Sequence, residues 1–131
     1  MPITCSVDRA RQRLFTAVEG TVTHLEVMAH WEKKRDDNCL HLSELIDATQ
    51  VAVAFSAAEV LQIAQLLRDL VRRNALGPTA IVTGDDVSYG MILMLEILVE
   101  DVCDVRPFCD PGEAEEWLNA HPRLFTPAQE G

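Results

Sequence analysis

The chain has 131 residues, and 48% of them are hydrophobic, which predicts one folded domain over residues 1–131 with a real core. The formal net charge is −10, and residues 100–131 carry eight acidic side chains against two basic ones. Such a surface repels phosphate backbones and anionic headgroups, so we expect neither nucleic acid nor a membrane as a partner.

Nothing in the sequence directs the chain to a membrane or out of the cell. The first residues lack the apolar segment of a signal peptide, and no run reaches the roughly 20 apolar residues that span a bilayer. We therefore expect a cytoplasmic protein with reduced thiols. The cysteines form no C-x-x-C pair and have no histidine at zinc-finger spacing, so we expect no metal and no cofactor. They are Cys5, Cys39, Cys103 and Cys109.

Two antiparallel strands are predicted first, at Thr4–Asp8 and Arg13–Gly20, with a basic turn between them. A helix follows, because Thr23 and Glu26 have the spacing of a capping box. The residues of this helix that we expect to face the core are Leu25, Met28, Ala29 and Trp31.

A third strand is predicted at Leu42–Asp47, and a second capping box follows it at Ser56 and Glu59. The long helix that begins there has one apolar face and is predicted to stop at Gly77-Pro78. That face consists of Val60, Ile63, Ala64, Leu67, Leu70 and Val71.

The rest of the chain predicts strands at Thr79–Val82 and Val102–Phe108, a third helix from Ser88 and a fourth helix capped by Asp110. Strands that alternate with helices in this way are typical of crossover connections. The sequence therefore predicts an α/β fold with a mixed, mostly parallel sheet of about five strands and four helices.

The last third of the chain is similar to the end of SpoIIAA-like (STAS-like) domains. Gly90-Met91 opens an apolar helix, a strand ends with the residues VRPF, and an acidic helix closes with Trp117-Leu118. Upstream, Gly20, the helix capped by Thr23 and the strand that ends at Asp47 follow the same order, so the resemblance covers roughly residues 6–118. It implies helices and strands wound as a β-α superhelix. Relatives in the wider group act as anti-sigma-factor antagonists or as regulatory domains of anion transporters, and others resemble lipid carriers.

The resemblance points to Ser56 as a possible phosphoacceptor. In the anti-sigma antagonists a phosphorylatable serine or threonine begins the helix after the third strand, which is the position of Ser56 here. A phosphate there would gain from the free N–H groups of the helix. However, Phe55 precedes Ser56 where the family has Asp, and Glu59 would repel a phosphate. An ordinary helix cap is the alternative.

The third helix is the second candidate, because residues 91–99 leave it almost no polar face. The alternatives are plain core, a homodimer interface and the lining of a pocket for an apolar or lipid-like ligand. The residues proposed for the pocket or the interface are Tyr89, Met91, Met94, Leu95 and Leu98.

No pattern in the sequence indicates catalysis. There is no nucleophile elbow, P-loop or dinucleotide motif. The histidines have no common helix face and are expected at the surface or at caps; they are His24, His30, His41 and His121. We therefore expect a non-enzymatic, homodimeric interaction or regulatory module. The alternative is a carrier or sensor of a small apolar ligand.

Overall fold

The computed structural model describes residues 2–51 and 55–120. A five-stranded sheet lies at its centre, in the order β1-β2-β3-β4-β5. The strands are Ile3–Asp8 (β1), Arg13–Glu19 (β2), Ser43–Gln50 (β3), Thr79–Thr83 (β4) and Val105–Phe108 (β5). β1 runs antiparallel to β2, and all other neighbours are parallel. The predicted α/β class and the mixed, mostly parallel sheet are thus confirmed.

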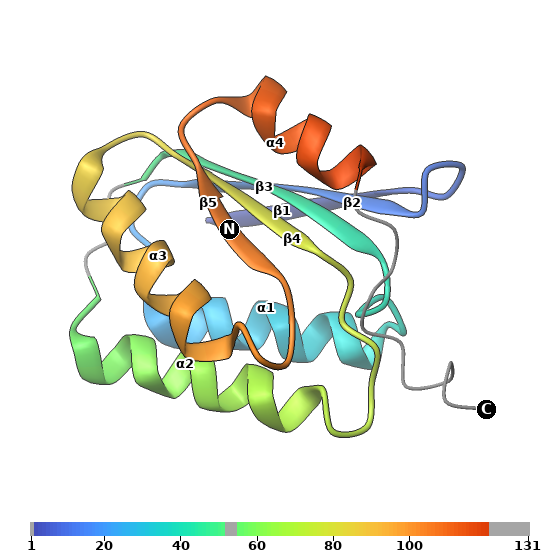
Figure 1. Ribbon diagram of the computed structural model, residues 1–131, viewed down its shortest axis with the longest axis horizontal. Helices are drawn as coiled ribbons and strands as arrows, with labels where there is room; N and C mark the ends of the chain where they lie inside the picture. Colours follow the sequence, from blue (N-terminus) through green and yellow to red (C-terminus); the bar gives the residue numbers. More distant parts are fainter. Residues whose placement is uncertain (1, 52–54, 121–131) are drawn as a thin grey trace.

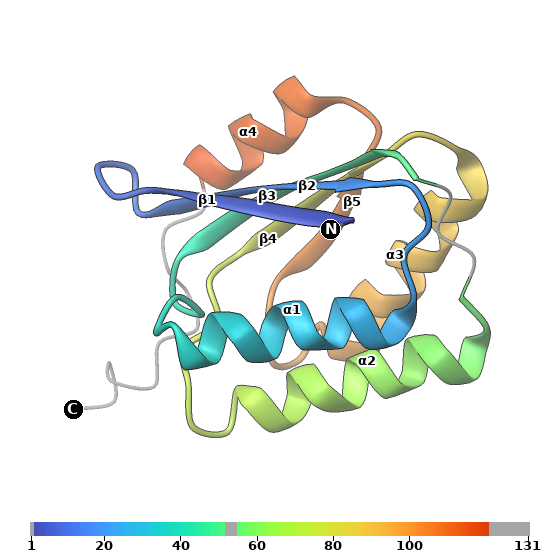
Figure 2. The ribbon, with the colours of Figure 1, turned by 180° about the vertical axis from the view of Figure 1, so that it is seen from behind.

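Three helices cover one face of the sheet and a single helix covers the other (Figures 1 and 2). The first group is α1 (His24–Asp36), α2 (Ala57–Leu70) and α3 (Asp86–Val99), and the single helix is α4 (Pro111–Asn119). The parallel strands follow one another in sequence order, and crossovers between parallel strands are right-handed. Each connecting helix therefore returns on the same side, and only α4, after the last strand, reaches the opposite face.

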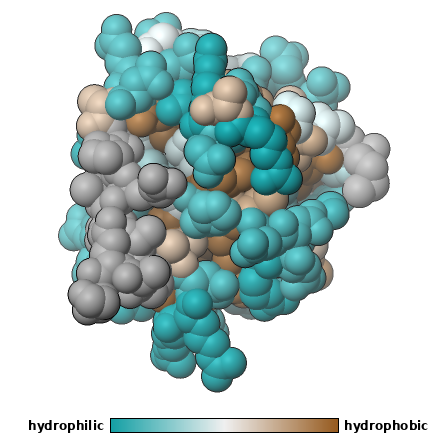
Figure 3. Space-filling model, turned by 90° about the vertical axis from the view of Figure 1, so that its right-hand side faces the viewer, coloured by the Kyte–Doolittle hydropathy of each residue, from teal (hydrophilic) through white to brown (hydrophobic). Residues whose placement is uncertain are grey.

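The interior strand β4 shows how this arrangement divides the core. All its residues are buried, as expected for a strand with helices on both faces. Ile81 joins the large core under α1, α2 and α3, whereas Ala80 and Val82 join a smaller core under α4. The outer surface seen from the right of Figure 1 is mostly hydrophilic, with hydrophobic areas between the polar side chains (Figure 3).

The capping signals at three helix starts are confirmed. Thr23 and Ser56 each complete a capping box, and the Asp110 side chain accepts from the N–H of Glu113. The predicted start of α3 at Ser88 is wrong. The cap is Asp85, whose carboxylate accepts from the N–H and the hydroxyl of Ser88. A carboxylate is a strong N-cap acceptor and complements the helix dipole, so α3 begins at Asp86.

The predicted end of the second helix is also wrong, because α2 stops at Leu70. The backbone N–H and the side-chain amide of Asn74 both donate to the Leu70 carbonyl, which closes the helix in a turn. Gly77 serves a different purpose: a Cβ there would collide with the backbone carbonyl of Leu42. Glycine is therefore required where the chain enters β4 beside the start of β3.

The inward face of α1 differs from the predicted one. Leu25 and Ala29 are exposed, Met28 is half-buried, and the buried residues are Trp31 and Lys34. Together with half-buried Val27, they lie on one side at helical spacing. The hydrophobic pattern did not reveal this face because a buried lysine belongs to it.

Candidate functional site

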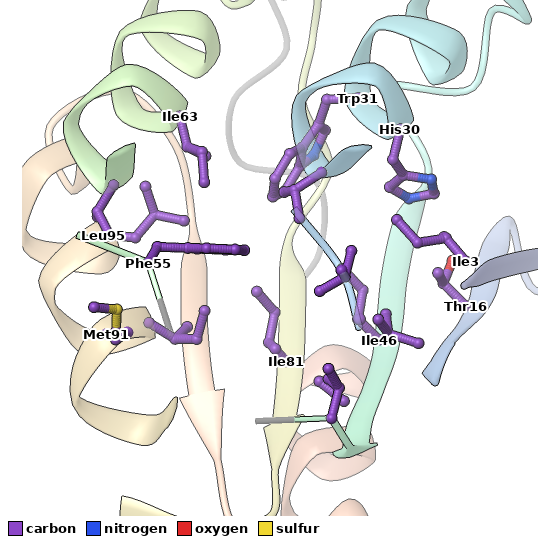
Figure 4. A pocket seen from close by; sticks show the side chains of 17 residues that line it. Ile3, Thr16, His30, Trp31, Ile46, Phe55, Ile63, Ile81, Met91 and Leu95 are labelled. Carbon is purple, nitrogen blue, oxygen red and sulfur yellow. The ribbon is translucent and has the colours of Figure 1, made fainter. Parts of the chain in front are cut away.

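An apolar cavity of about 70 Å³ lies between the sheet and the layer of α1, α2 and α3 (Figure 4). Its 17 lining residues come from β1 to β4, from the three helices and from the segments beside them. They are Ile3, Thr16, Val18, Val22, Val27, His30, Trp31, Ile46, Ala48, Val51, Phe55, Val60, Ile63, Ile81, Met91, Ile92 and Leu95. Engineered apolar cavities of about 150 Å³ stay dry and bind benzene or xenon, and this cavity, at about half that volume, suits a smaller apolar molecule.

The surface of the cavity is apolar throughout, but one side of it, called the polar side here, is formed by residues that carry polar groups behind that surface. Among the lining residues only Thr16, His30 and Trp31 carry polar side-chain atoms, and they come from β2 and α1. Figure 4 shows His30 and Thr16 on the side opposite Met91 and Leu95. The two ends of the cavity therefore differ in the groups that lie behind the same apolar surface.

Behind the polar side lies a buried network, the Glu44 cluster, formed by Thr16, His30, Lys34 and Glu44. The fully buried Glu44 carboxylate has Lys34 Nζ on Oε1, and on Oε2 it has His30 Nε2 and Thr16 Oγ1, each at 2.7 Å. His30 and Lys34 are one helical turn apart on α1, so both reach the same point on β3. The carboxylate can only accept, which places a proton on Nε2 of His30.

The electrostatics of the Glu44 cluster favour an ionised carboxylate. Desolvation alone would raise the pKa of Glu44, but the Lys34 ammonium and the hydrogen-bonded His30 imidazole outweigh it and hold that pKa at about 2. A general base at neutral pH needs a pKa near 7 and a free lone pair facing its substrate. Glu44 has neither, because protein donors already occupy both oxygens, and the cluster is a structural support for the cavity wall.

Trp31 carries a polar atom that the protein leaves unpaired. The residue is 1% exposed, and its indole Nε1 has no hydrogen-bond partner within residues 2–51 and 55–120. A buried N–H without an acceptor is rare and costly in folded proteins. The Nε1 atom is enclosed by the protein and is not exposed to the cavity, whose surface is apolar.

The residues proposed from the third helix separate into two groups. Met91 and Leu95 line the cavity, whereas Tyr89, Met94 and Leu98 are half-buried and lie outside its lining. Met94 and Leu98 pack against the large core instead.

The opposite side of α3 faces solvent. Val87 is 67% exposed, Ile97 59% and Leu93 39%. The helix is therefore apolar all round for two reasons, since one side packs inward and the other presents apolar side chains at the surface.

Ser56 is exposed just before α2, where it is the N-cap residue and forms both hydrogen bonds of a capping box with Glu59. Its hydroxyl accepts from the N–H of Glu59 at 3.1 Å, and the Glu59 carboxylate accepts from the N–H of Ser56 at 2.9 Å. A phosphate on Ser56 would stand beside this carboxylate, which is an unfavourable pairing of like charges.

Two of the cysteines, Cys5 and Cys103, have a raised thiol pKa and are therefore not activated nucleophiles. Although Cys5 is an exposed residue, its sulfur lies 3.3 Å from Thr16 Oγ1, and the desolvation there raises the pKa of the thiol. Burial raises the pKa of Cys103 to about 12. Both thiols stay protonated at neutral pH, and the thiolate is the reactive form.

The expectation of surface or capping histidines is wrong for His30, which joins the Glu44 cluster. His24 lies at the start of α1 and bonds Gln62 of α2 at 2.9 Å. His41 is half-buried, and His121 lies outside the described residues. In the part of the chain that the structure describes, no three His, Cys, Asp or Glu side chains gather as metal ligands. In that same part, every helix is too short or too polar to cross a bilayer.

Hydrophobic patterning does not predict the Glu44 cluster behind the polar side of the cavity. His30, Trp31 and Lys34 follow Val27 at helical spacing, and Glu44 lies on the same buried face as Ile46 of β3 and Leu42, which precedes β3. The sequence feature that could have indicated the cluster is therefore a basic residue at a core position of α1, Lys34, and an acidic residue at a core position of β3, Glu44. Trp31 was expected to face inward, and its burial confirms this.

A comparison with solved structures finds an uncharacterised protein of the DUF3478 family, from Shewanella loihica PV-4, that has a SpoIIAA-like fold. The superposition has a TM-score of 0.57 and 16% sequence identity, and it covers 88% of this chain and 93% of that one. The likeness shows that this chain has a SpoIIAA-like fold, as its sequence predicted. No family model and no curated protein matches the chain.

Proposed function

We propose that this protein is a non-enzymatic binding module that holds a small apolar molecule in the cavity between α1, α2, α3 and the sheet. The observation that carries the proposal is the cavity itself, an apolar space lined from seven helices and strands. Folded interiors are packed close to the density of organic crystals, and each unfilled space of methyl size costs stability. A ligand would restore the missing contacts.

The chemistry of the surroundings supports binding rather than catalysis. Glu44 has a pKa of about 2 and is fully buried with protein donors on both oxygens, and the Cys5 and Cys103 thiols are held protonated. A SpoIIAA-like fold is also consistent with an interaction or regulatory module. If the protein is a carrier, the molecule bound in the cavity is its cargo. If it is a sensor, binding of that molecule is the signal.

Xenon provides the first test, because it binds apolar cavities without directional contacts. In protein labelled with ¹³C at the methionine methyl groups, xenon should shift the Met91 resonance in a saturable way. The Met94 resonance is the internal control, since Met94 is on the same helix but outside the lining. Equal, linear shifts of both methyl groups would mean non-specific contact and would overturn the proposal.

Native mass spectrometry provides the second test. Gently purified protein should carry a small mass that organic solvent extracts. The control is the Ala48→Leu variant, in which extra methyl groups occupy the cavity beside β3. A bound mass that persists equally in this variant would place the ligand elsewhere.

A second candidate function is a homodimer formed through the outer side of α3, favoured by the exposed apolar side chains of Val87, Leu93 and Ile97. Sedimentation should show a dimer, and Ile97→Asp should make it monomeric while the fold is kept. Met94→Asp is the wrong probe, because Met94 packs against the core and its loss would unfold the protein. A wild-type monomer at high concentration would rule this candidate out.

A further inference from the structure

We propose that the outer edge of strand β1 pairs with the same edge of a second copy of this chain, in an antiparallel register centred on Cys5. The inference goes beyond the cavity and requires no ligand. It is an alternative to a dimer through α3, because β1 and β5 lie at opposite edges of the sheet and α3 packs against β5.

The hydrogen bonds of β1 define which of its backbone groups face outward. The N–H of Glu19 donates to the Pro2 carbonyl at 2.9 Å, so these two residues form a hydrogen-bonded pair of the antiparallel ladder. Such pairs alternate with non-bonded pairs along the ladder, so Thr4 and Ser6 also bond to β2. The residues between them direct their N–H and C=O groups away from β2, and they are Ile3, Cys5 and Val7.

The outward groups are accessible. Residues 4–7 of β1 are exposed, and β1 lies in front of the other strands in Figure 2. Cys5 is opposite Thr16 in a non-bonded pair, where side chains come closest, and the Thr16 hydroxyl lies 3.3 Å from the Cys5 sulfur. An exposed row of N–H and C=O groups is a template for a further strand.

The two edges of the sheet differ in their protection against such pairing. Proteins commonly protect an edge with a short strand, a proline or a lysine. β5 has four residues, and Pro107 among them has no N–H to donate. β1 has six residues and contains neither proline nor lysine. The edge of β1 is therefore the one suited to a partner strand.

A second copy fits this edge because the edge is complementary to itself. A twofold axis at Cys5 places Ile3 opposite Val7 of the second copy and Cys5 opposite Cys5 of the second copy. All three outward residues then form hydrogen-bonded pairs, and each pair exchanges two bonds. Any other twofold register pairs fewer of these three residues with one another.

The side chains in this register are also compatible. Ile3 and Val7 form apolar cross-strand pairs, and Thr4 and Ser6 form pairs of hydroxyl groups. The chain has a net charge of −10, so most surfaces of two copies repel each other, but none of residues 3–7 is charged. Like charges therefore do not face each other across the axis.

Amide hydrogen exchange tests the pairing without a substitution. In concentrated protein the amides of Ile3, Cys5 and Val7 should be protected, and dilution should remove their protection. The amides of Thr4 and Ser6 are the internal control, because they bond to β2 in both states. Exchange of the outward amides that is fast at every concentration would overturn the inference.

A short linker between thiols tests the position of the axis. The Cα atoms of a hydrogen-bonded antiparallel pair are about 5.5 Å apart, so the linker should join the two Cys5 thiols of the dimer. The reaction is run in alkaline buffer, because the pKa of this thiol is raised. It uses Cys109→Ser, because Cys109 is the second exposed cysteine, whereas Cys39 and Cys103 are buried.

The matched control for the linker combines Cys109→Ser with Cys5→Ser and Val7→Cys, which moves the thiol to the next outward position. In the proposed register the two thiols at position 7 are separated by four residues, roughly 14 Å along the strands. The control should therefore not be joined. A control that is joined as readily as Cys5 would overturn the register.

Sedimentation equilibrium measures the strength of the dimer. Cys5→Pro removes the central N–H of each copy and should raise the dissociation constant about 30-fold, the equivalent of ~2 kcal/mol for two hydrogen bonds. Cys5→Ala keeps this N–H and is the control. If Cys5→Pro does not fold, amide exchange and crosslinking decide.

Two results of sedimentation would overturn the inference. One is a wild-type monomer at every concentration, and the other is a dimer that Ile97→Asp dissociates and Cys5→Pro does not, which would place the second copy on α3. Neither result affects the cavity, which xenon binding tests separately.

Discussion

At the scale of single residues, the least expected feature is an ion pair in the interior. The side chain of Lys34 on α1 is 4% exposed, and that of Glu44 on β3 is fully buried, so the ion pair joins the helix to the sheet. A buried pair gives little net stability against an apolar replacement, yet removal of one partner is costly because it leaves a lone buried charge. Its position behind the polar side of the cavity gives it a second role, since it holds His30 and Thr16 in place.

Lys34→Met should therefore reduce the free energy of unfolding by about 3–5 kcal/mol, as urea denaturation would measure. The neighbouring Lys33→Met is the matched control. Lys33 pairs with Asp37 at the surface, where both side chains are more than half exposed, and such pairs contribute below about 1 kcal/mol. Equal effects of the two substitutions would contradict the buried position of Lys34.

The low pKa of Glu44 makes stability depend on pH with a definite sign. That pKa falls from an ordinary value of 4.5 to about 2 on folding, so the stabilisation is complete above pH 4.5 and is lost as the pH falls toward 2. The free energy of unfolding of the wild-type protein should therefore be larger than that of Glu44→Gln by on the order of 3 kcal/mol at pH 6. This difference should close near pH 2. Urea denaturation at both pH values measures this difference. The other carboxylates titrate in both proteins, so their contributions cancel in the difference. A gap that does not change with pH would refute this assignment.

At the scale of helices and strands, α2 and α1 begin with the same device. In each, the hydroxyl of the cap residue accepts from the backbone N–H of a glutamate, and the carboxylate of that glutamate accepts from the backbone N–H of the cap residue. The pairs are Thr23 with Glu26 in α1 and Ser56 with Glu59 in α2. A cap of this kind explains Ser56 without a phosphate.

Ser56→Ala should consequently cost about 1 kcal/mol of stability, and Thr23→Ala should cost about the same. Chemical denaturation of both variants makes the comparison. A switch residue would behave differently: protein purified from its native host would carry phosphate on Ser56, and Ser56→Ala would alter partner binding beyond its effect on stability. Those two results together would revive the phosphoacceptor interpretation.

Local signals predicted the elements well and their faces less well. The capping boxes at Thr23 and Ser56 each involve residues three positions apart, so they can be recognised without the fold. The side of α1 that faces the sheet depends on Glu44, which is distant in sequence and accepts from His30 and Lys34. Hydrophobic periodicity treats both as surface residues, and only the tertiary pairing makes their burial favourable.

At the scale of the whole molecule, the two faces of the sheet are packed differently. Directly beneath α4 the sheet is closely packed, and there Ala80 packs with Val82, Ala114 and Leu118. The face toward α1, α2 and α3 leaves the cavity. The fold explains this contrast, because one helix can settle onto a twisted sheet more closely than three helices that must also pack against one another.

Two alanines at buried positions on opposite faces test that contrast. Ala48 of β3 lines the cavity, and Ala80 of β4 lies under α4; they are 3% and 0% exposed. Ala48→Val places two methyl groups in empty space and should raise the free energy of unfolding by about 0.5–2 kcal/mol, as cavity filling commonly does. Ala80→Val should lower it by about 1–3 kcal/mol, because a packed interior must strain to admit the same groups. Thermal and urea unfolding of both variants give the comparison, and xenon should bind Ala80→Val like wild type but Ala48→Val weakly. If Ala48→Val were as destabilising as Ala80→Val, the space beneath the sheet would already be filled by protein atoms and no ligand could occupy it.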